Sequence, residues 1–336
     1  MIRRILPLLA LCAGLSAVAA PVAHDLYLCA SINKNYVIGS KLVTLSGLYR
    51  RDDGGTYRHF GPNFPGFFSL AIDPRDHRVM YAATLNGCLA SRDGGATWRI
   101  ATSWDMTEPK DIFVDPNAPD HVYLALPDGI AISRDGGRTW PRAERGLPER
   151  GKYTQVVKVD RTRAGRALAG CESGIYVTDD AGGNWRRVFA TRYTITDLRQ
   201  SPLDPALWLA STQADGVILS RDGGLTWNRL AGVPSAEALY NVAFDATRAG
   251  HFAVSSWSYG VYTTEDGGAT WTERNAGLPD EHCVFRVGID PDNGRLHAAV
   301  YRDAIYVSDD FGRTWRKDGL EGSTVYNFVF LPRLQR

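Results

Sequence analysis

Asp111 and Asp197 are the residues whose type and spacing come closest to a catalytic pair. They occupy the same position in two copies of a repeated segment, two copies apart along the chain. Two carboxyl groups can hydrolyse a glycosidic bond as general acid and general base when they lie roughly 6.5–9.5 Å apart, as in inverting enzymes. The sequence has no Gly-x-Ser-x-Gly and no His-Glu-x-x-His segment, so serine-hydrolase and zinc-protease motifs are absent. Glycoside hydrolysis is therefore the catalytic hypothesis.

A second set of residues could bind a ligand without transforming it. The position that the two aspartates share is polar in most copies and reads Ser69, Asp111, Val156, Asp197, Asn241, Arg286 and Asn327. Aromatic residues precede it in three copies, and two later loops add further rings and charges: Tyr240, Phe285, Tyr326, Trp257, Tyr259, Tyr301, Arg302 and Asp303. Rings that stack and guanidinium groups that bind in a bidentate way suit a sugar or a peptide loop. The alternative is that the polar residues line a solvated channel and the rings fill gaps between sheets.

No metal or cofactor site is expected. Four cysteines follow residue 19, without CxxC spacing: Cys29, Cys88, Cys171 and Cys283. Their disulfide pairing cannot be read from the sequence, and Cys29 with Cys88 is one candidate pair. The Asp-Gly turns offer too few ligands for a calcium loop, and the Gly-Gly pairs do not precede helices as phosphate loops would.

These residues are positioned by an internal repeat. A segment of the form Ser/Thr-x-Asp-x-Gly-x-x-Trp, usually with Thr before the Trp, recurs at 91–98, 133–140, 178–185, 220–227, 264–271 and 308–315, and a shorter copy spans 51–57. From Tyr57 the successive terminal aromatic residues are 41, 42, 45, 42, 44 and 44 residues apart. Seven copies at this period predict seven four-stranded blades of a β-propeller.

Within a copy, short apolar runs alternate with Gly, Pro and Asp. In the second copy these runs are 68–72, 79–84, 88–91 and a strand from Trp98, which predicts four antiparallel strands from the axis outward. The Asp side chain should accept backbone N–H groups in the turn before the outermost strand. The first copy has candidate strands at 25–31 and 42–49 but no inner strand. Residues 326–332 match an inner strand, so we predict an all-β, single propeller whose C-terminal strand completes the first blade.

The first residues of the chain predict its compartment, and its net charge bears on its binding partners. Residues 1–19 form a basic start, an apolar run and an Ala-Val-Ala end, the pattern of a cleaved signal peptide. The propeller domain would then span 20–336, in the periplasm or outside the cell. A net charge of +1 gives no reason to expect nucleic-acid binding, no later run is long enough to insert into a membrane, and we expect a monomer.

The repeated segments, with Gly-Leu-Pro at Gly146 and Gly277 and Asp-Pro at Asp73, Asp115 and Asp290, resemble the Asp-box (BNR) propeller superfamily. It includes sialidases, xyloglucan-type glycoside hydrolases, sortilin-like receptors and the photosystem II assembly propeller, so the resemblance implies the fold and leaves the activity open. The sequence lacks the Arg-Ile-Pro motif and arginine triad of sialidases. Xyloglucan-type hydrolases pair two propellers around a cleft. The expected function is a binding or scaffold propeller that holds a protein segment or a glycan on its loop face, with a glycoside hydrolase as the alternative.

Overall fold

The computed structural model describes residues 23–32 and 45–334, and their regular secondary structure is entirely β. The predicted signal peptide, residues 1–19, lies outside these ranges. The described part of the chain contains no helix that could cross a membrane. The all-β prediction is confirmed.

Four of the sheets each contain four antiparallel strands that follow one another in the sequence. They are β4 (Phe67–Ile72), β5 (Met80–Thr84), β6 (Gly87–Ser91) and β7 (Arg99–Ile100); β11 (Thr154–Val159), β12 (Ala167–Cys171), β13 (Gly174–Thr178) and β14 (Arg186–Ala190); β15 (Ile195–Gln200), β16 (Trp208–Thr212), β17 (Val217–Ser220) and β18 (Asn228–Arg229); and β19 (Leu239–Phe244), β20 (Phe252–Ser256), β21 (Gly260–Thr264) and β22 (Thr272–Glu273). These four sheets confirm the predicted four-stranded antiparallel unit.

The remaining strands form a three-stranded and a seven-stranded sheet. The smaller consists of β8 (Asp111–Val114), β9 (Val122–Leu126) and β10 (Gly129–Ser133), and an isolated bridge joins its outer strand to Arg142. The larger has the order β23 (Val284–Ile289), β24 (Leu296–Val300), β25 (Asp303–Ser308), β26 (Arg316–Pro332), β1 (His24–Ile32), β2 (Gly47–Arg51) and β3 (Tyr57–Phe60).

Strand β26 gives the seven-stranded sheet its length because it has two partners. Its first part pairs with β25 from Arg316 to Ser323, and its second part pairs with β1 from Ser323 to Pro332. The C-terminal strand thus lies beside the first described strand, as the sequence predicted.

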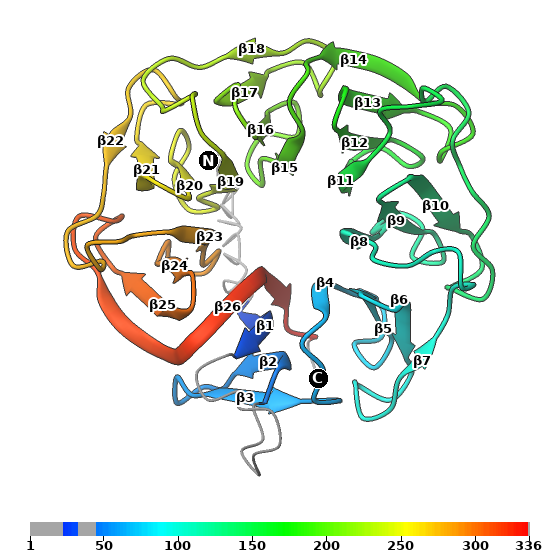
Figure 1. Cartoon of the computed structure of the whole chain (residues 1–336), viewed down its shortest axis with the longest axis horizontal. Helices are drawn as coiled ribbons and strands as arrows, with labels where there is room; N and C mark the ends of the chain where they lie inside the picture. The colour runs from blue at the N-terminus through cyan, green and yellow to red at the C-terminus, as the bar shows by residue number, and fades with distance from the viewer. Residues whose placement is uncertain (1–22, 33–44, 335–336) are drawn as a thin grey trace, which may run out of the picture.

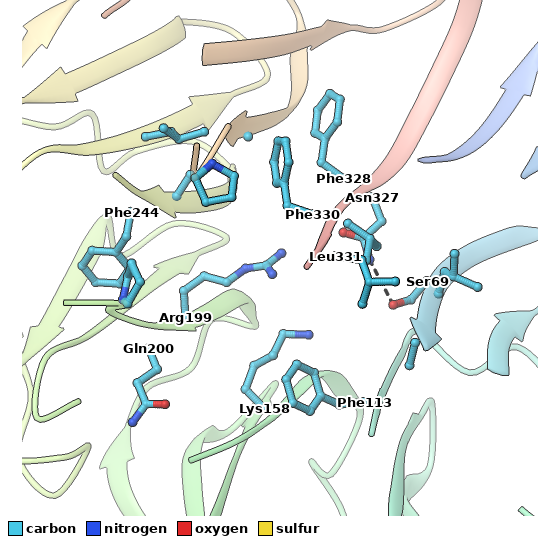
Figure 2. A pocket seen from close by; sticks show the side chains of 18 of the residues that line it. Ser69, Phe113, Lys158, Arg199, Gln200, Phe244, Asn327, Phe328, Phe330 and Leu331 are labelled. Atoms are coloured by element: carbon cyan, nitrogen blue, oxygen red, sulfur yellow. Dashed lines mark hydrogen bonds between the residues drawn. The ribbon is translucent and has the colours of Figure 1, made fainter. Parts of the chain in front are cut away.

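The sheets stand around a common centre (Figure 1). The first strand of each later repeat is innermost, and beside β1–β3 the second part of β26 takes this position. The innermost strands enclose an axial cavity, seen from close by in Figure 2. Loops that lead from the outermost strand to the next innermost strand lie on one side, together with the loops between the second and third strands. We call this side the loop face. The opposite side carries the turns with the repeated Asp-Gly segments, and we call it the turn face.

The repeated segments are structural. The carboxylate of Asp93 accepts the backbone N–H of Thr97 at 2.9 Å and its hydroxyl at 2.6 Å. These hydrogen bonds lower the pKa of Asp93 to about 2. Ser91 donates to the same carboxylate at 2.8 Å and accepts the N–H of Gly95 at 2.9 Å. The side chains of Asp93 and Ser91 are therefore paired within the turn.

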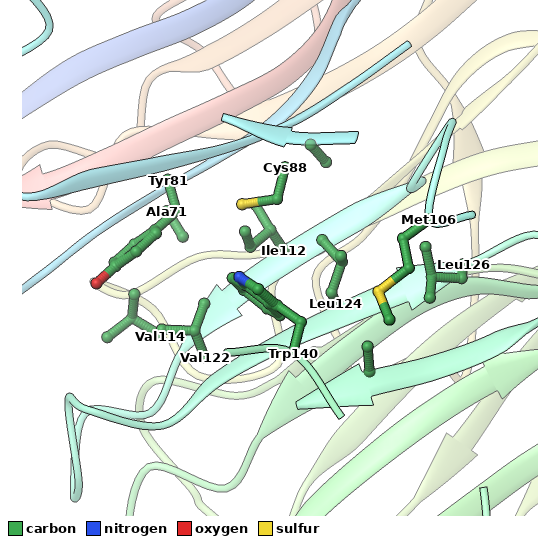
Figure 3. Close-up of a cluster of buried hydrophobic side chains, with 12 residues drawn as sticks. Ala71, Tyr81, Cys88, Met106, Ile112, Val114, Val122, Leu124, Leu126 and Trp140 are labelled. Carbon is green, nitrogen blue, oxygen red and sulfur yellow. The ribbon is translucent and has the colours of Figure 1, made fainter. Parts of the chain in front are cut away.

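The tryptophan that ends each segment packs between neighbouring sheets. Trp140 is 7% exposed and lies in a cluster with Tyr81, Cys88, Ile112 and Leu124 (Figure 3). Two of these residues come from the β4–β7 sheet and two from the β8–β10 sheet. Because a large ring buries much apolar area, each tryptophan contributes to the stability of two sheets.

Two sequence-based expectations differ from the structure. The second strand of the first copy was expected at 42–49; β2 begins at Gly47, and residues 42–44 lie outside the described ranges. The four cysteines are free thiols, with Cys29, Cys88 and Cys171 buried. Burial raises the pKa of Cys171 to about 12, so this thiol stays protonated and packs as a small apolar group.

Candidate functional site

A layer of polar side chains crosses the centre of the molecule at the position predicted from the repeat. Ser69 donates to one carboxylate oxygen of Asp111 at 2.8 Å. The other oxygen accepts the backbone N–H of Val157 at 3.1 Å and the ammonium group of Lys158. Both side chains of this ion pair are 9% exposed. Burial lowers the pKa of Lys158, and the Asp111 carboxylate opposes that effect only in part.

Asp197 and Asn241 make the same kind of contact in the next sheets. Asp197 accepts the N–H of Val242 at 3.3 Å and the Nε–H of Arg199 at 3.0 Å. Asn241 accepts the N–H of Val287 at 2.8 Å and donates to the carbonyl of the same residue at 2.7 Å. The polar position therefore joins neighbouring sheets through hydrogen bonds to the backbone.

Arg286 and Asn327 complete the layer. The Arg286 guanidinium donates to the carbonyl of Tyr326 at 2.7 Å and to the carbonyl of Tyr240 at 3.2 Å. Asn327 donates to the hydroxyl of Ser69 at 3.1 Å, which returns the chain of contacts to its start. Val156 is the one apolar member of the layer, and it is buried.

This geometry does not favour Asp111 and Asp197 as an acid–base pair. Both are buried, at 6% and 5% exposure, and each forms an ion pair with a cationic side chain. A general acid must reach the substrate with its proton, whereas both carboxylates are already held in contacts with neighbouring side chains. Both side chains instead help to hold neighbouring sheets together through hydrogen bonds to the backbone.

The loop face brings together most of the predicted aromatic residues. Ring centroids of Tyr240 lie 5.8 Å from Trp257 and 4.8 Å from Phe285. Trp257 lies 4.8 Å from Tyr301, and Phe285 lies 5.9 Å from Tyr326. These half-buried rings form one continuous group, which we call the aromatic cluster. The cluster extends to one ring that the sequence analysis missed, Phe68, at 5.6 Å from Tyr326.

Cationic side chains border the aromatic cluster. The Arg302 guanidinium lies 5.0 Å from the centre of the Tyr301 ring, and the Lys110 ammonium lies 5.5 Å from that of Phe68. Arg302 is exposed and has a positive φ of 56°, a conformation that costs energy for a residue other than glycine. The loop thus presents a cation beside an aromatic surface.

A shallow pocket of about 460 Å³ adjoins the aromatic cluster. It lies between the loops of two sheets and is lined by Tyr193, Gln213, Ala214, Ala236, Glu237, Ala238, Tyr240 and Trp257. Two members of the cluster therefore form one wall of this pocket, so a ligand could contact the cluster and the pocket together.

Two predicted site residues take no part in the ring contacts of the cluster. Tyr259 makes backbone hydrogen bonds with Ser256 and Asn275. Asp303 accepts the Tyr306 hydroxyl at 2.6 Å and the Lys317 ammonium at 3.2 Å. Both residues therefore stabilise the loops in which they lie.

A larger cavity lies on the other side of the polar layer, toward the turn face. It has a volume of about 500 Å³, and Figure 2 shows Lys158 and Arg199 extending into it. Neither residue was predicted from the sequence as part of a site. The signal was present, because each lies two positions after a member of the polar layer, and alternate residues of a strand point to the same side. Phe113 lies two positions after Asp111 and lines the cavity in the same way.

Among the described residues, no group of three or more His, Cys, Asp or Glu side chains is arranged to hold a metal ion.

A family model for the BNR/Asp-box repeat matches residues 306–317. This chain contains a BNR/Asp-box repeat. Over 163 residues it is 28% identical to an oligoxyloglucan-reducing end-specific xyloglucanase of Emericella nidulans, a match that covers 43% of this chain and 19% of the relative. The match therefore spans less than half of this chain and about a fifth of that enzyme.

Solved structures of two kinds share the fold. The GH74 enzyme of Niastella koreensis superimposes with a TM-score of 0.69 at 18% identity, over 82% of this chain and 51% of the enzyme. The YCF48 protein of Cyanidioschyzon merolae superimposes with a TM-score of 0.59 at 19% identity, over 76% of this chain and 86% of that protein. A further YCF48 structure is described as bound to a D1 peptide and has a TM-score of 0.58 at 18% identity, over 75% of this chain and 82% of that one. At these identities the likeness shows the propeller fold alone.

Proposed function

We propose that this chain is a binding protein that holds an extended segment of another protein on its loop face. The observation that carries the proposal is the continuous aromatic cluster from Phe68 to Tyr301, bordered by Lys110 and Arg302. Aromatic and arginine side chains supply much of the energy of protein recognition. The adjoining pocket of about 460 Å³ gives one side chain of a bound segment a place to insert.

We also propose an architecture for the propeller that carries the loop face. The four-stranded units, the two sheet-forming parts of β26 and the spacing of the repeats support seven blades, with β26 completing the blade of β1–β3. A peptide-bound propeller of similar length, YCF48, supports a single propeller as a sufficient binding unit. Residues 1–19 would direct export of the chain to the periplasm or beyond the cell. The exported protein would act as a monomer.

A second candidate is a glycoside hydrolase, favoured by the 28% identity to a xyloglucanase over part of the chain. The chain spans about half the length of the GH74 enzymes that it resembles. The ion pairs of Asp111 and Asp197 weigh against those residues as its acid and base. Binding of a glycan without hydrolysis is a third outcome, which the test described next also detects.

The test compares binding and turnover in one set of proteins. Residues 20–336 would be applied to an array of peptides tiled over exported proteins, and separately incubated with xyloglucan oligosaccharides while new reducing ends are measured. We expect peptide binding that weakens at least about tenfold in Trp257→Ala and in Tyr301→Ala. The exposed Ser258→Ala is the matched control and should bind as the wild type does.

Hydrolysis would contradict this proposal. Release of reducing ends that disappears in Asp111→Asn or Asp197→Asn, in variants that still unfold cooperatively, would establish the hydrolase instead. Binding of the oligosaccharides without turnover would replace the protein segment with a glycan as the ligand of the aromatic cluster.

A further inference from the structure

The cavity on the turn side of the polar layer is separate from the loop-face site. Its volume of about 500 Å³ is in the range of small-molecule sites. None of the described residues that line it is Asp or Glu, whereas five can carry positive charge: His24, Lys158, Arg161, Arg199 and Arg286. Its lining thus differs from a solvated channel in which charges of both signs alternate.

The charges beside this cavity do not balance. Lys158 pairs with Asp111, and Arg199 pairs with Asp197. Arg286 forms no ion pair with a described residue; its hydrogen bonds go to backbone carbonyl groups. Burial lowers the pKa of Arg286 to about 10, so it is still protonated at neutral pH. Arg161, which also lines the cavity, hydrogen-bonds to Gln200 and Ser201 and forms no ion pair with a described residue. The cations beside the cavity therefore outnumber the carboxylates paired with them, and an anionic group would offset this excess.

Unused hydrogen-bond donors point to the place of that group. Arg199 uses its Nε–H for Asp197, and both of its terminal nitrogens lack a hydrogen-bond partner among the described residues. Its side chain is 33% exposed and extends into the cavity toward the side where Lys158 lies (Figure 2). A guanidinium with two free terminal nitrogens binds a carboxylate through two parallel hydrogen bonds.

The rest of the cavity wall is apolar. Phe113, Phe244, Phe328 and Phe330 line it, and Figure 2 shows their rings around the two cationic side chains. Phenyl rings reduce the amount of water around the cations, which strengthens the attraction of the cations for an anion. They also offer contact to a hydrocarbon body about as large as the cavity.

We propose that the turn-side cavity binds a small amphipathic monocarboxylate, with its carboxylate on Arg199 and its hydrocarbon part against the phenyl rings. The negative charge of the carboxylate offsets part of the excess positive charge beside the cavity. The site is independent of the loop-face site, because the polar layer lies between them.

Octanoate is the probe for this proposal, and octanamide is its uncharged counterpart of the same length. Isothermal titration of residues 20–336 should detect octanoate binding at concentrations up to about 1 mM and binding of octanamide at least about tenfold weaker. Equal binding of the two compounds, or no octanoate binding in this range, would overturn the proposal.

Two variants locate the site. Arg199→Gln combined with Asp197→Asn removes the guanidinium without leaving a buried carboxylate unpaired, and should weaken octanoate binding at least about tenfold. Ala246→Trp places a large ring in the cavity wall without altering an ion pair and should have the same effect. Arg163→Gln changes an exposed arginine of the neighbouring turn and should leave binding unchanged.

The experiment also separates the two sites. Trp257→Ala should bind octanoate with wild-type affinity even if the loop-face proposal is correct. Octanoate binding that is lost in Trp257→Ala but retained in Ala246→Trp would move the site to the loop face and overturn the inference. A thermal unfolding curve for each variant shows that the folded protein is being compared.

Discussion

Asn241 is joined to Val287 of the neighbouring sheet by two hydrogen bonds, one from the backbone N–H of Val287 at 2.8 Å and one to its carbonyl at 2.7 Å. Asp111 and Asp197 accept the backbone N–H groups of Val157 and Val242 in the same way. A side chain at this position thus acts as an additional strand partner for the next sheet. Among the described residues, most neighbouring sheets have no strand-to-strand backbone pairing, and this side chain provides a contact to the backbone in its place.

Replacement of Asn241 by Ala should destabilise the protein by about 2–3 kcal/mol, because two buried backbone groups lose their partners. The free energy of unfolding from urea denaturation measures this. Ser258→Ala, on an exposed loop, should change it by less than about 0.5 kcal/mol. Equal stability of both variants would mean that water replaces the Asn241 side chain and that the contact does not hold the sheets together.

The repeated Gly-Leu-Pro segments provide a second prediction. Gly146 has a φ of +89°, and a Cβ added there would lie 1.9 Å from the carbonyl oxygen of Trp185. Gly146→Ala should therefore cost about 3 kcal/mol or more, since backbone must move. Gly151 also has a positive φ, of +77°, but the nearest atom to an added Cβ is 3.6 Å away. Gly151→Ala should cost only about 1–2 kcal/mol, and similar losses for both would contradict the close approach.

The sequence predicted the strands, the turns and the position of the polar layer because these follow from local patterns. Asp93 forms its hydrogen bonds within four residues, so its role can be read from one repeat. The backbone groups that Asn241 and Asp197 contact in the next sheet lie about one repeat away, and only the packing of sheets brings them together. For the same reason the sequence indicated Asp111 as a catalytic candidate but not its ion pair with Lys158, and it indicated the aromatic cluster without Phe68.

The buried His297 should make stability depend on pH. Burial lowers its pKa to about 3, its ring lies 5.9 Å from both Phe328 and Phe330, and neither ring nitrogen has a hydrogen-bond partner. The unfolded chain binds a proton below pH about 6.5 that the native state does not bind until pH about 3. Stability therefore falls as pH decreases through this window.

His297→Phe should reduce that dependence. The slope of the unfolding free energy between pH 6.5 and 4, from urea denaturation at each pH, should be smaller in the variant than in the wild type. An unchanged slope would mean that His297 takes up its proton in the native state. The Asp-box carboxylates contribute at lower pH, because hydrogen bonds lower the pKa of Asp266 to about 2, and their stabilisation is lost as pH falls from about 4 through that value.

The double pairing of β26 predicts that the chain cannot fold stably without its last strand segment. Residues 323–332 pair with β1, and Val325, Phe328 and Leu331 are buried in the clusters shared with it. Loss of three such side chains removes roughly 5 kcal/mol or more of apolar burial, comparable to the whole stability of a domain. Truncation after Gly322 should abolish the cooperative thermal transition measured by circular dichroism.

A shorter truncation is the control. Removal of residues 334–336 leaves the Arg333 backbone N–H bonded to Ala23 at 2.8 Å and its guanidinium bonded to Asp25 at 2.8 Å, so the melting temperature should stay within a few degrees of wild type. A synthetic peptide of residues 321–334 should restore the transition of the longer truncation by adding the missing strand to β1. If the protein truncated after Gly322 melts cooperatively without the peptide, β1–β3 are stable against their neighbours alone, and the pairing with β26 is not required for the fold.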